Sequence, residues 1–328
     1  MPDGPIRLEA PPHFDPPSLT GLGEGVQVSR QTRTQGSTVY WDTPDLRLAR
    51  WGCSLMSVEN EGWTVSLPAA PGGNDRQARA FLFGGAEEAP PAGALDLLTA
   101  YVRTVELLPV GRLRRVRQAV QVGGSNGSGI RVLSDEVSVL HGRRVAIRYR
   151  ELVLDAGREA DTALVHGVIA RLRAAGAGGP DPVPEYARVL GPGAMEPPEV
   201  VVDVPGPDST VGQAVRAAIA GSVHRLLRHD AGVRRGDDSE SVHQARVATR
   251  RLRSDLVTFK TLLEPDPVAA MRDELKWVGG LLGDVRDTDV LLERMAGRLR
   301  EIPGPAAGQR AILKRLTDRR TAARVRML

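Results

Sequence analysis

The chain has 328 residues, with 44 Lys and Arg against 40 Asp and Glu, and 41% of its residues are hydrophobic. This length suggests two domains, and the hydrophobic content supports packed cores, which argues against a disordered chain. The single cysteine, Cys53, excludes an internal disulfide framework and a multi-cysteine zinc site. No apolar run reaches the length of a membrane span and no signal peptide is evident, so we expect a cytoplasmic protein without a membrane partner.

The net charge of +4 hides an asymmetry between two parts of the chain. Residues 209–328 carry 23 Lys and Arg against 15 Asp and Glu, a net charge of +8. Residues 1–208 therefore carry 21 Lys and Arg against 25 Asp and Glu, a net charge of −4. All three lysines, Lys260, Lys276 and Lys314, lie in the second part. The asymmetry predicts separate domains and an anionic partner for the second.

Residues 1–190 show mainly the pattern of antiparallel strands. Apolar and polar side chains alternate, as in half-buried strands, in residues 26–30, 63–67 and 116–122. The glycine-rich segments 72–75 and 123–127 predict hairpin turns. Two helices are expected among the strands, near 92–105 and 158–175.

The segment 191–208 is rich in Gly and Pro and predicts an interdomain linker. Beyond it the apolar residues follow helical spacing, which predicts helices near 209–230, 239–263, 267–300 and 306–327. The expected fold class is therefore α+β. An antiparallel, closed or nearly closed β-barrel spans 1–190, and an all-α helical bundle spans 209–328.

One face of the second of these four helices carries a stripe of basic side chains. At 100° per residue, His243, Arg246, Arg250 and Arg253 fall within an arc of about 80° that borders the packed face. Like charges in such a place repel one another, and a bound anion would stabilise them. The next helix adds Arg272, Lys276 and Arg286 around three glycines, and the last adds Lys314. The alternative interpretation is a solvated helix face with internal salt bridges.

The same residues resemble the CHAD family. The resemblance lies in 242–253, 274–277 and 282–287. CHAD domains are helical and bind inorganic polyphosphate through histidines and basic residues that line a groove or pore. The resemblance implies phosphate contacts from His243, Arg246, Arg250, Arg253, Lys276 and Arg286, to which we add Arg272 and Lys314. A full CHAD domain consists of two related four-helix halves, so we expect one half here. Three alternatives follow for this half: it pairs with a second copy as a homo-oligomer, it binds polyphosphate more weakly, or it is a truncated product.

Residues 1–190 resemble the CYTH family, whose triphosphate tunnel fold is an antiparallel barrel. The best match is 39–52, which is similar to the family's tyrosine-aspartate-threonine signature, with weaker matches at 62–68, 109–117 and 134–137. CYTH enzymes surround a triphosphate with Arg and Lys. They hold a divalent metal through glutamates of the first strand, and the metal neutralises charge on the leaving phosphate.

This sequence departs from the CYTH pattern at most ligand positions. The first-strand motif falls on Asp3, Pro5 and Arg7, the family's terminal lysine falls near Glu185, and residues 1–208 contain no lysine. The tunnel residues that persist are Arg76, Arg114, Arg117, Asp135 and Glu151. The resemblance therefore predicts a degenerate scaffold with no assigned catalytic residue, metal ligand or cofactor.

The leading hypothesis is a protein that binds inorganic polyphosphate or another polyanion, with polyphosphate granules as one expected location. The main alternative is an active triphosphatase that hydrolyses tripolyphosphate in the CYTH tunnel with Mg²⁺ or Mn²⁺. Two further alternatives are a scaffold protein and a nucleic-acid-binding protein. The last is disfavoured because aromatic residues make up only 4% of the chain and no groove-reading motif is present.

Overall fold

The computed structural model describes residues 6–23, 25–68, 79–86, 88–123, 129–157, 160–179, 183–236, 239–301 and 306–328. The chain divides into two compact units. The first, which we call the sheet unit, comprises Met1–Leu95 and Thr104–Glu196. The second, the helical unit, comprises Asp96–Arg103 and Pro197–Leu328. The expected α+β class is confirmed.

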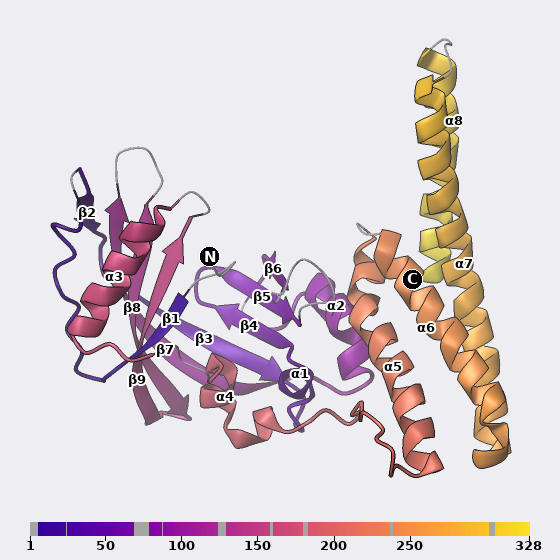
Figure 1. Ribbon diagram of the computed structural model, residues 1–328, viewed down its shortest axis with the longest axis horizontal. Helices are drawn as coiled ribbons and strands as arrows, with labels where there is room; N and C mark the ends of the chain where they lie inside the picture. The colour runs from indigo at the N-terminus through magenta and orange to yellow at the C-terminus, as the bar shows by residue number, and fades with distance from the viewer. Residues whose placement is uncertain are drawn as a thin grey trace. The chain divides into compact units, whose positions relative to one another are not determined.

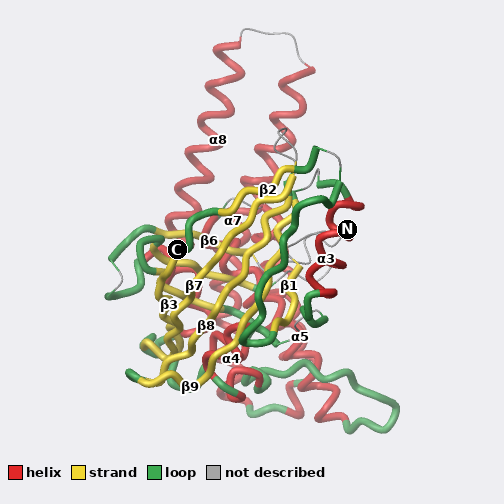
Figure 2. The backbone as a smooth tube through the Cα atoms, turned by 90° about the vertical axis from the view of Figure 1, so that its left-hand side faces the viewer, coloured by secondary structure: helices red, strands yellow, loops and turns green. Residues whose placement is uncertain are grey.

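Nine antiparallel strands form one sheet in the sheet unit (Figure 2). They are β1 (Ile6–Ala10), β2 (Gln27–Arg30), β3 (Thr34–Asp42), β4 (Ser54–Val58), β5 (Gly62–Leu67), β6 (Arg79–Phe83), β7 (Leu108–Gly123), β8 (Ile130–His141) and β9 (Arg144–Ala156). Their order is β1-β9-β8-β7-β3-β4-β5-β6, and β2 pairs separately with one end of β7. In the part of the chain that the structure describes, β1 and β6 stay at opposite edges. The sheet is open, so the expected barrel is not confirmed.

The strands expected from alternation are confirmed as β2, β5 and part of β7, and the two expected helices as α2 (Ala92–Val102) and α3 (Thr162–Ala174). Two short helices, α1 (Arg47–Arg50) and α4 (Glu185–Leu190), were not expected. The turn expected at 72–75 lies outside the described residues, as does most of the one at 123–127.

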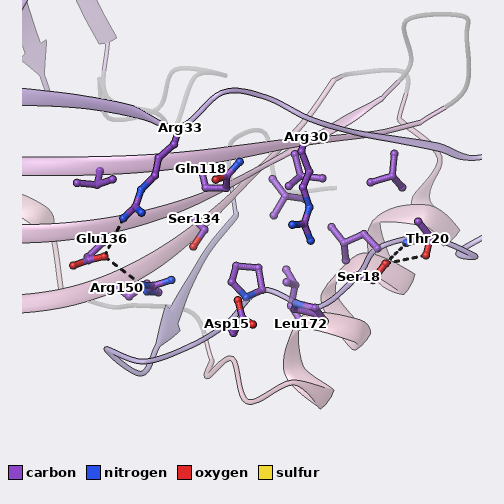
Figure 3. Close-up of a pocket in the computed structure, with 17 residues that line it drawn as sticks. Asp15, Ser18, Thr20, Arg30, Arg33, Gln118, Ser134, Glu136, Arg150 and Leu172 are labelled. Atoms are coloured by element: carbon purple, nitrogen blue, oxygen red, sulfur yellow. Dashed lines mark hydrogen bonds and ion pairs between the residues drawn. The ribbon is translucent and has the colours of Figure 1, made fainter.

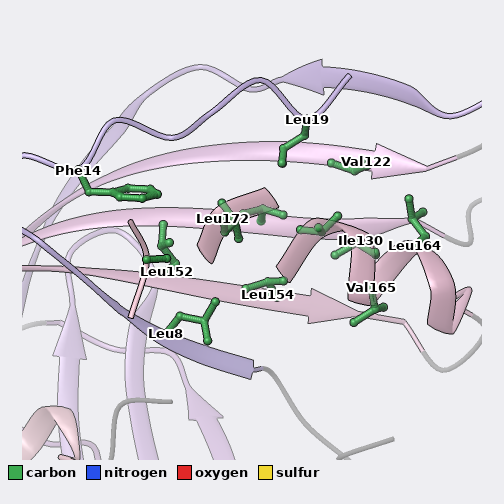
Figure 4. Close-up of a cluster of buried hydrophobic side chains, with 13 residues drawn as sticks. Leu8, Phe14, Leu19, Val122, Ile130, Leu152, Leu154, Leu164, Val165 and Leu172 are labelled. Atoms are coloured by element: carbon green, nitrogen blue, oxygen red, sulfur yellow. The ribbon is translucent and has the colours of Figure 1, made fainter. Parts of the chain in front are cut away.

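Side chains of β7, β8 and β9 alternate between the two faces of the sheet. On one face, Val122, Ile130 and Leu154 pack with Val168 and Leu172 of α3 in the main core of this unit (Figure 4). The opposite face carries Leu113 and Val137 in a second cluster and Ala119, Leu133 and Val153 in a third. Charged side chains lie between these last two clusters on that face.

The stretch 39–52, which carries the CYTH resemblance, has a structural role. The buried Asp42 carboxylate accepts hydrogen bonds from the backbone N–H groups of Thr43, Leu48 and Ala49, at 2.7, 2.8 and 2.9 Å. The Leu48 and Ala49 donors are free N–H groups in the first turn of α1, which a carboxylate satisfies well. The motif therefore fixes the turn from β3 into α1.

The helical unit contains α5 (Val211–Arg235), α6 (Ser239–Thr258), α7 (Pro265–Glu301) and α8 (Ala306–Met327) (Figure 1). The four expected helices are thus confirmed, although the first continues past 230 to Arg235, and the second ends at Thr258 and is followed by the short 3₁₀ helix η2 (Lys260–Leu262). The expected linker begins with another 3₁₀ helix, η1 (Pro192–Met195). None of the described helices is both long and apolar enough to cross a membrane.

A small apolar core joins α5, α6, α7 and α8. It includes Val233, Val242, Leu282, Val285 and Ala323. Arg324 adds polar contacts, because its Nη2 donates at 3.1 Å to the carbonyl oxygens of Val233 and Arg234 at the end of α5. Beyond this core, the second half of α7 and the first half of α8 run side by side as a two-helix arm (Figure 1).

The closest approach of α5 to α6 depends on Gly232. A Cβ at this position would lie 2.6 Å from Cβ of Ser241 and in collision with its Oγ. We expect Gly232→Ala to lower the free energy of unfolding of the helical unit by about 1–3 kcal/mol, as overpacked interiors do. Gly212→Ala in the same helix is the control, since nothing lies near its Cβ position and alanine favours helix. Equal stability of the two variants in urea denaturation would contradict the expectation.

Candidate functional site

Helices α6 and α7 pack as antiparallel neighbours, and two glycines of α7 set their spacing. A Cβ on Gly279 would lie 3.4 Å from Cγ2 of Thr249, and one on Gly283 would lie 3.9 Å from the Arg246 guanidinium. These pairs fix the register, which places Arg253 level with Lys276 and His243 level with Arg286. The close approach brings basic residues of two helices onto one face.

We call this set the basic stripe: His243, Arg246, Arg250 and Arg253 of α6 with Arg272, Lys276 and Arg286 of α7. Two of its members have partners. Arg246 Nη1 lies 3.2 Å from Asp287 Oδ1, and Arg286 Nη1 donates to the Ser239 carbonyl at 3.4 Å. The Arg246–Asp287 pair is largely exposed, with 45% and 75% of the two side chains accessible, so water screens it and it stabilises little.

The other five members of the basic stripe make no hydrogen bond or ion pair with any described residue. They are His243, Arg250, Arg253, Arg272 and Lys276. His243 and Arg253 are half-buried, and the other three are exposed. Opposite charges four residues apart on a solvated helix face can form an ion pair, as Lys314 and Asp318 of α8 do at 2.7 Å. The basic stripe thus has free donors that can bind an anion.

Lys314 does not join the basic stripe. It lies on α8, and the contact of Arg320 with Asp289 of α7, at 2.5 Å, places Lys314 in the two-helix arm beyond the start of α6. Arg320 also donates to the Gly236 carbonyl at 3.1 Å. The basic residues of α8 nearest the core therefore hold helices together.

The second set of predicted residues meets in the sheet unit. In register across β7, β8 and β9, Arg117 lies opposite Asp135, and Asp135 lies opposite Glu151. Arg117 donates from Nε and Nη2 to the two Asp135 oxygens, at 2.8 and 2.6 Å. Glu151 Oε2 accepts from Arg7 Nη1 at 3.1 Å. Arg117, Asp135 and Glu151, all predicted from the sequence, are thus brought together.

Two residues that the sequence analysis did not assign complete this charged cluster. Arg115 lies 3.2 Å from Asp135 and contacts Glu185, the first residue of α4. The Tyr40 hydroxyl also donates to Glu185, at 2.7 Å. A cavity of about 400 Å³ borders the cluster. We define the charged cluster as Arg7, Arg115, Arg117, Asp135, Glu151 and Glu185.

Arg114, which was predicted in this place, lies on the opposite face of the sheet and is exposed. The spacing in the strand is the reason, because residues 114 and 117 are three apart and cannot share a face, whereas 115 and 117 can. This alternation was visible in the sequence and would have identified Arg115. Arg76 lies outside the described residues.

The charged cluster has three arginines and three carboxylates, so its formal charges balance. Burial by itself would lower the pKa of Arg115, but the attraction of Glu185, Asp135 and Glu151 raises it above the ordinary value. Burial, together with repulsion from Glu185, raises the pKa of Glu151. Each carboxylate faces an arginine, and no group of His, Cys, Asp and Glu suited to a metal occurs among the described residues. The cluster therefore does not fit a divalent metal.

The charged cluster affects the ionisation of two tyrosines. Burial and the nearby Glu185 raise the pKa of Tyr40 and of Tyr149. We expect spectrophotometric titration of the folded protein to show tyrosines that resist ionisation above the ordinary phenol range. The resistant fraction should shrink in Tyr40→Phe and Tyr149→Phe. A titration curve of ordinary midpoint, unchanged by either substitution, would show that the hydroxyls are not buried beside the carboxylates.

Comparison with known proteins defines the class of the helical unit. Residues 217–328 match the family model of the CHAD domain, so this range is a CHAD domain. The match does not extend to the sheet unit, where the antiparallel sheet is compatible with the CYTH resemblance.

The whole chain has curated relatives. It is 30% identical over 320 residues to an uncharacterized protein of Mycobacterium tuberculosis strain CDC 1551 / Oshkosh, and equally to one of strain H37Rv. Each alignment covers 92% of this chain and 60% of the relative. The chain thus spans 60% of the length of these relatives.

Proposed function

We propose that the helical unit binds inorganic polyphosphate along the basic stripe. The observation that supports this most directly is that Arg250, Arg253, Arg272 and Lys276 share one face with no acidic partner among the described residues. Arginine forks hold phosphate oxygens through two hydrogen bonds, and lysine adds a mobile charge. The CHAD match supports the same ligand, because this domain is associated with polyphosphate binding.

The length of the basic stripe favours a chain of phosphates over a single one. His243 and Arg253 are ten residues apart on α6, which corresponds to roughly 15 Å along the helix axis. Orthophosphate can reach one or two of the cations, whereas an extended polyanion can contact all of them. We therefore expect affinity to rise from phosphate to tripolyphosphate to long-chain polyphosphate.

Titration of the full chain with these three ligands tests the proposal. Long-chain polyphosphate should bind most tightly at low salt, and its affinity should fall steeply as salt is raised, because the contacts are ionic and largely exposed. Competition with duplex DNA separates polyphosphate binding from general polyanion binding. Absence of binding at low salt, or displacement of polyphosphate by equimolar DNA phosphate, would reject it.

We also propose that the sheet unit is a CYTH-like scaffold that does not hydrolyse triphosphates. The charged cluster supports this proposal, because Asp135, Glu151 and Glu185 already neutralise the arginines that a triphosphate would need. Incubation with tripolyphosphate and Mg²⁺ or Mn²⁺ tests it. Release of phosphate that Arg115→Ala abolishes and Arg250→Ala preserves would establish the triphosphatase instead.

A further inference from the structure

The sheet unit has a second cavity, of about 460 Å³, on the sheet face opposite to the charged cluster (Figure 3). The segment 15–20 closes one side and α3 contributes Leu172. The rest of the lining comes from Arg33 and from strands β2, β7, β8 and β9. The volume lies within the range of small-molecule sites. The CHAD match lies outside this cavity.

One part of the lining is apolar and well packed. Leu19, Val132 and Leu172 are almost completely buried, and Val28, Val116 and Val120 lie beside them. Ser134 lies at the edge of this apolar part with 7% of its surface exposed. Its hydroxyl has no hydrogen-bond partner among the residues that the structure describes. The cavity thus offers an apolar surface and one free polar group.

The charged part of the lining has an excess of arginine. Glu136 is shared by Arg33, at 3.6 Å, and Arg150, at 3.4 Å, and Arg150 also donates to the Phe14 carbonyl at 2.8 Å. Arg30 extends from β2 into the cavity and has no ion pair within the described ranges (Figure 3). Asp15 is the second carboxylate of the lining. Three arginines against two carboxylates leave a net charge of +1.

We propose that this cavity binds a small amphipathic anion, with its carboxylate or phosphate group on Arg30 and its apolar part on Val120, Val132 and Leu172. A carboxylate neutralises the net charge of the lining, and the Ser134 hydroxyl gains an acceptor. A cationic amphiphile would leave the site with a charge of +2, and a neutral one would leave Arg30 unpaired. Charge and apolar surface together therefore select the ligand class.

Sodium octanoate, octyl phosphate, octanol and octylamine serve as probes in calorimetric titration of the full chain. We expect the two anions to bind and the alcohol and amine to bind at least tenfold more weakly. Comparison of octanoate with octyl phosphate shows which head group Arg30 prefers. Equal binding of anion and amine, or no binding of either anion at millimolar concentration, would overturn the proposal.

Charge variants locate the binding to this cavity. Arg30→Gln should weaken octanoate at least tenfold, and Arg30→Glu, which changes the lining to −1, should bind octylamine better than octanoate. Arg131→Gln is the matched control, because Arg131 is an exposed arginine on the other face of β8. Unchanged octanoate affinity in Arg30→Gln would reject the site. The Arg30 and Arg131 side chains are exposed, so we expect their substitution to leave the fold intact. A cooperative thermal unfolding transition checks this for each variant. Polyphosphate affinity should be the same in all three variants.

Discussion

The double variant Arg250→Ala, Arg253→Ala is expected to bind long-chain polyphosphate about a hundredfold more weakly than the wild type at low salt. Both guanidinium groups lack partners among the described residues, so their removal takes away ligand contacts and disturbs no internal ion pair. Charge-assisted hydrogen bonds contribute roughly 1.5–3 kcal/mol each, and about 1.4 kcal/mol corresponds to a factor of ten. We take the lower end of this range because the groups are accessible to water.

The arm of α7 provides the matched control. Arg294→Ala, Arg298→Ala removes the same charge from the same unit, at exposed positions outside the basic stripe. We expect this control to weaken polyphosphate by less than about fivefold, through long-range attraction that salt screens. Equal losses in the two double variants would mean that net charge alone attracts the ligand and that the basic stripe is not a site.

The helices of the CHAD domain were predictable because local signals define them. Apolar spacing and the Gly-Pro segments mark their positions, and most of the observed ends agree to within a few residues. The composition of the basic stripe was predictable for the same reason, since residues on one helix face follow from angular spacing. The position of Lys314 was not predictable, because it depends on the axial register between α7 and α8. Only tertiary contacts such as Arg320–Asp289 determine that register.

The sheet unit was less predictable from its sequence. Alternation identified β2, β5 and β7, but the order of the strands and the open edges depend on pairings between distant segments. The charged cluster joins β1, β7, β8, β9 and the start of α4, which are far apart in the chain. Glu185 in particular was noted only as a departure from the CYTH pattern, whereas the structure shows what the acid does there. It accepts from Tyr40 and pairs with Arg115.

The variant Asp135→Ala is expected to lower the free energy of unfolding of the sheet unit by about 3–5 kcal/mol. Removal of one partner from a buried ion pair leaves an uncompensated charge, which costs more than the pair itself contributes. Asp135 has no exposed side-chain surface, and it faces Arg117 and Arg115, whose side chains are only 33% and 23% exposed. Glu106→Ala is the control in the same unit, because Glu106 is exposed, does not line the cavity beside the cluster and has no ion pair in the described part of the chain.

Urea denaturation followed by tryptophan fluorescence measures this loss in a Trp277→Phe background. The three remaining tryptophans, Trp41, Trp51 and Trp63, all lie in the sheet unit and report on it alone. Adding Arg117→Met to Asp135→Ala should recover part of the stability, since the unpaired cation is then removed as well. A loss below about 1 kcal/mol, or no recovery in the double variant, would show that the cluster is hydrated and weakly coupled.

The same variant tests why the sheet unit should not bind triphosphates. If Asp135 occupies the arginines in place of phosphate, its removal frees Arg115 and Arg117 for an external anion. Tripolyphosphate should then raise the denaturation midpoint of the sheet unit in Asp135→Ala and leave that of the Glu106→Ala control unchanged, because a ligand that binds only the folded state stabilises it. No shift in either variant would contradict this explanation, because it would mean that Arg115 and Arg117 alone do not make an anion site.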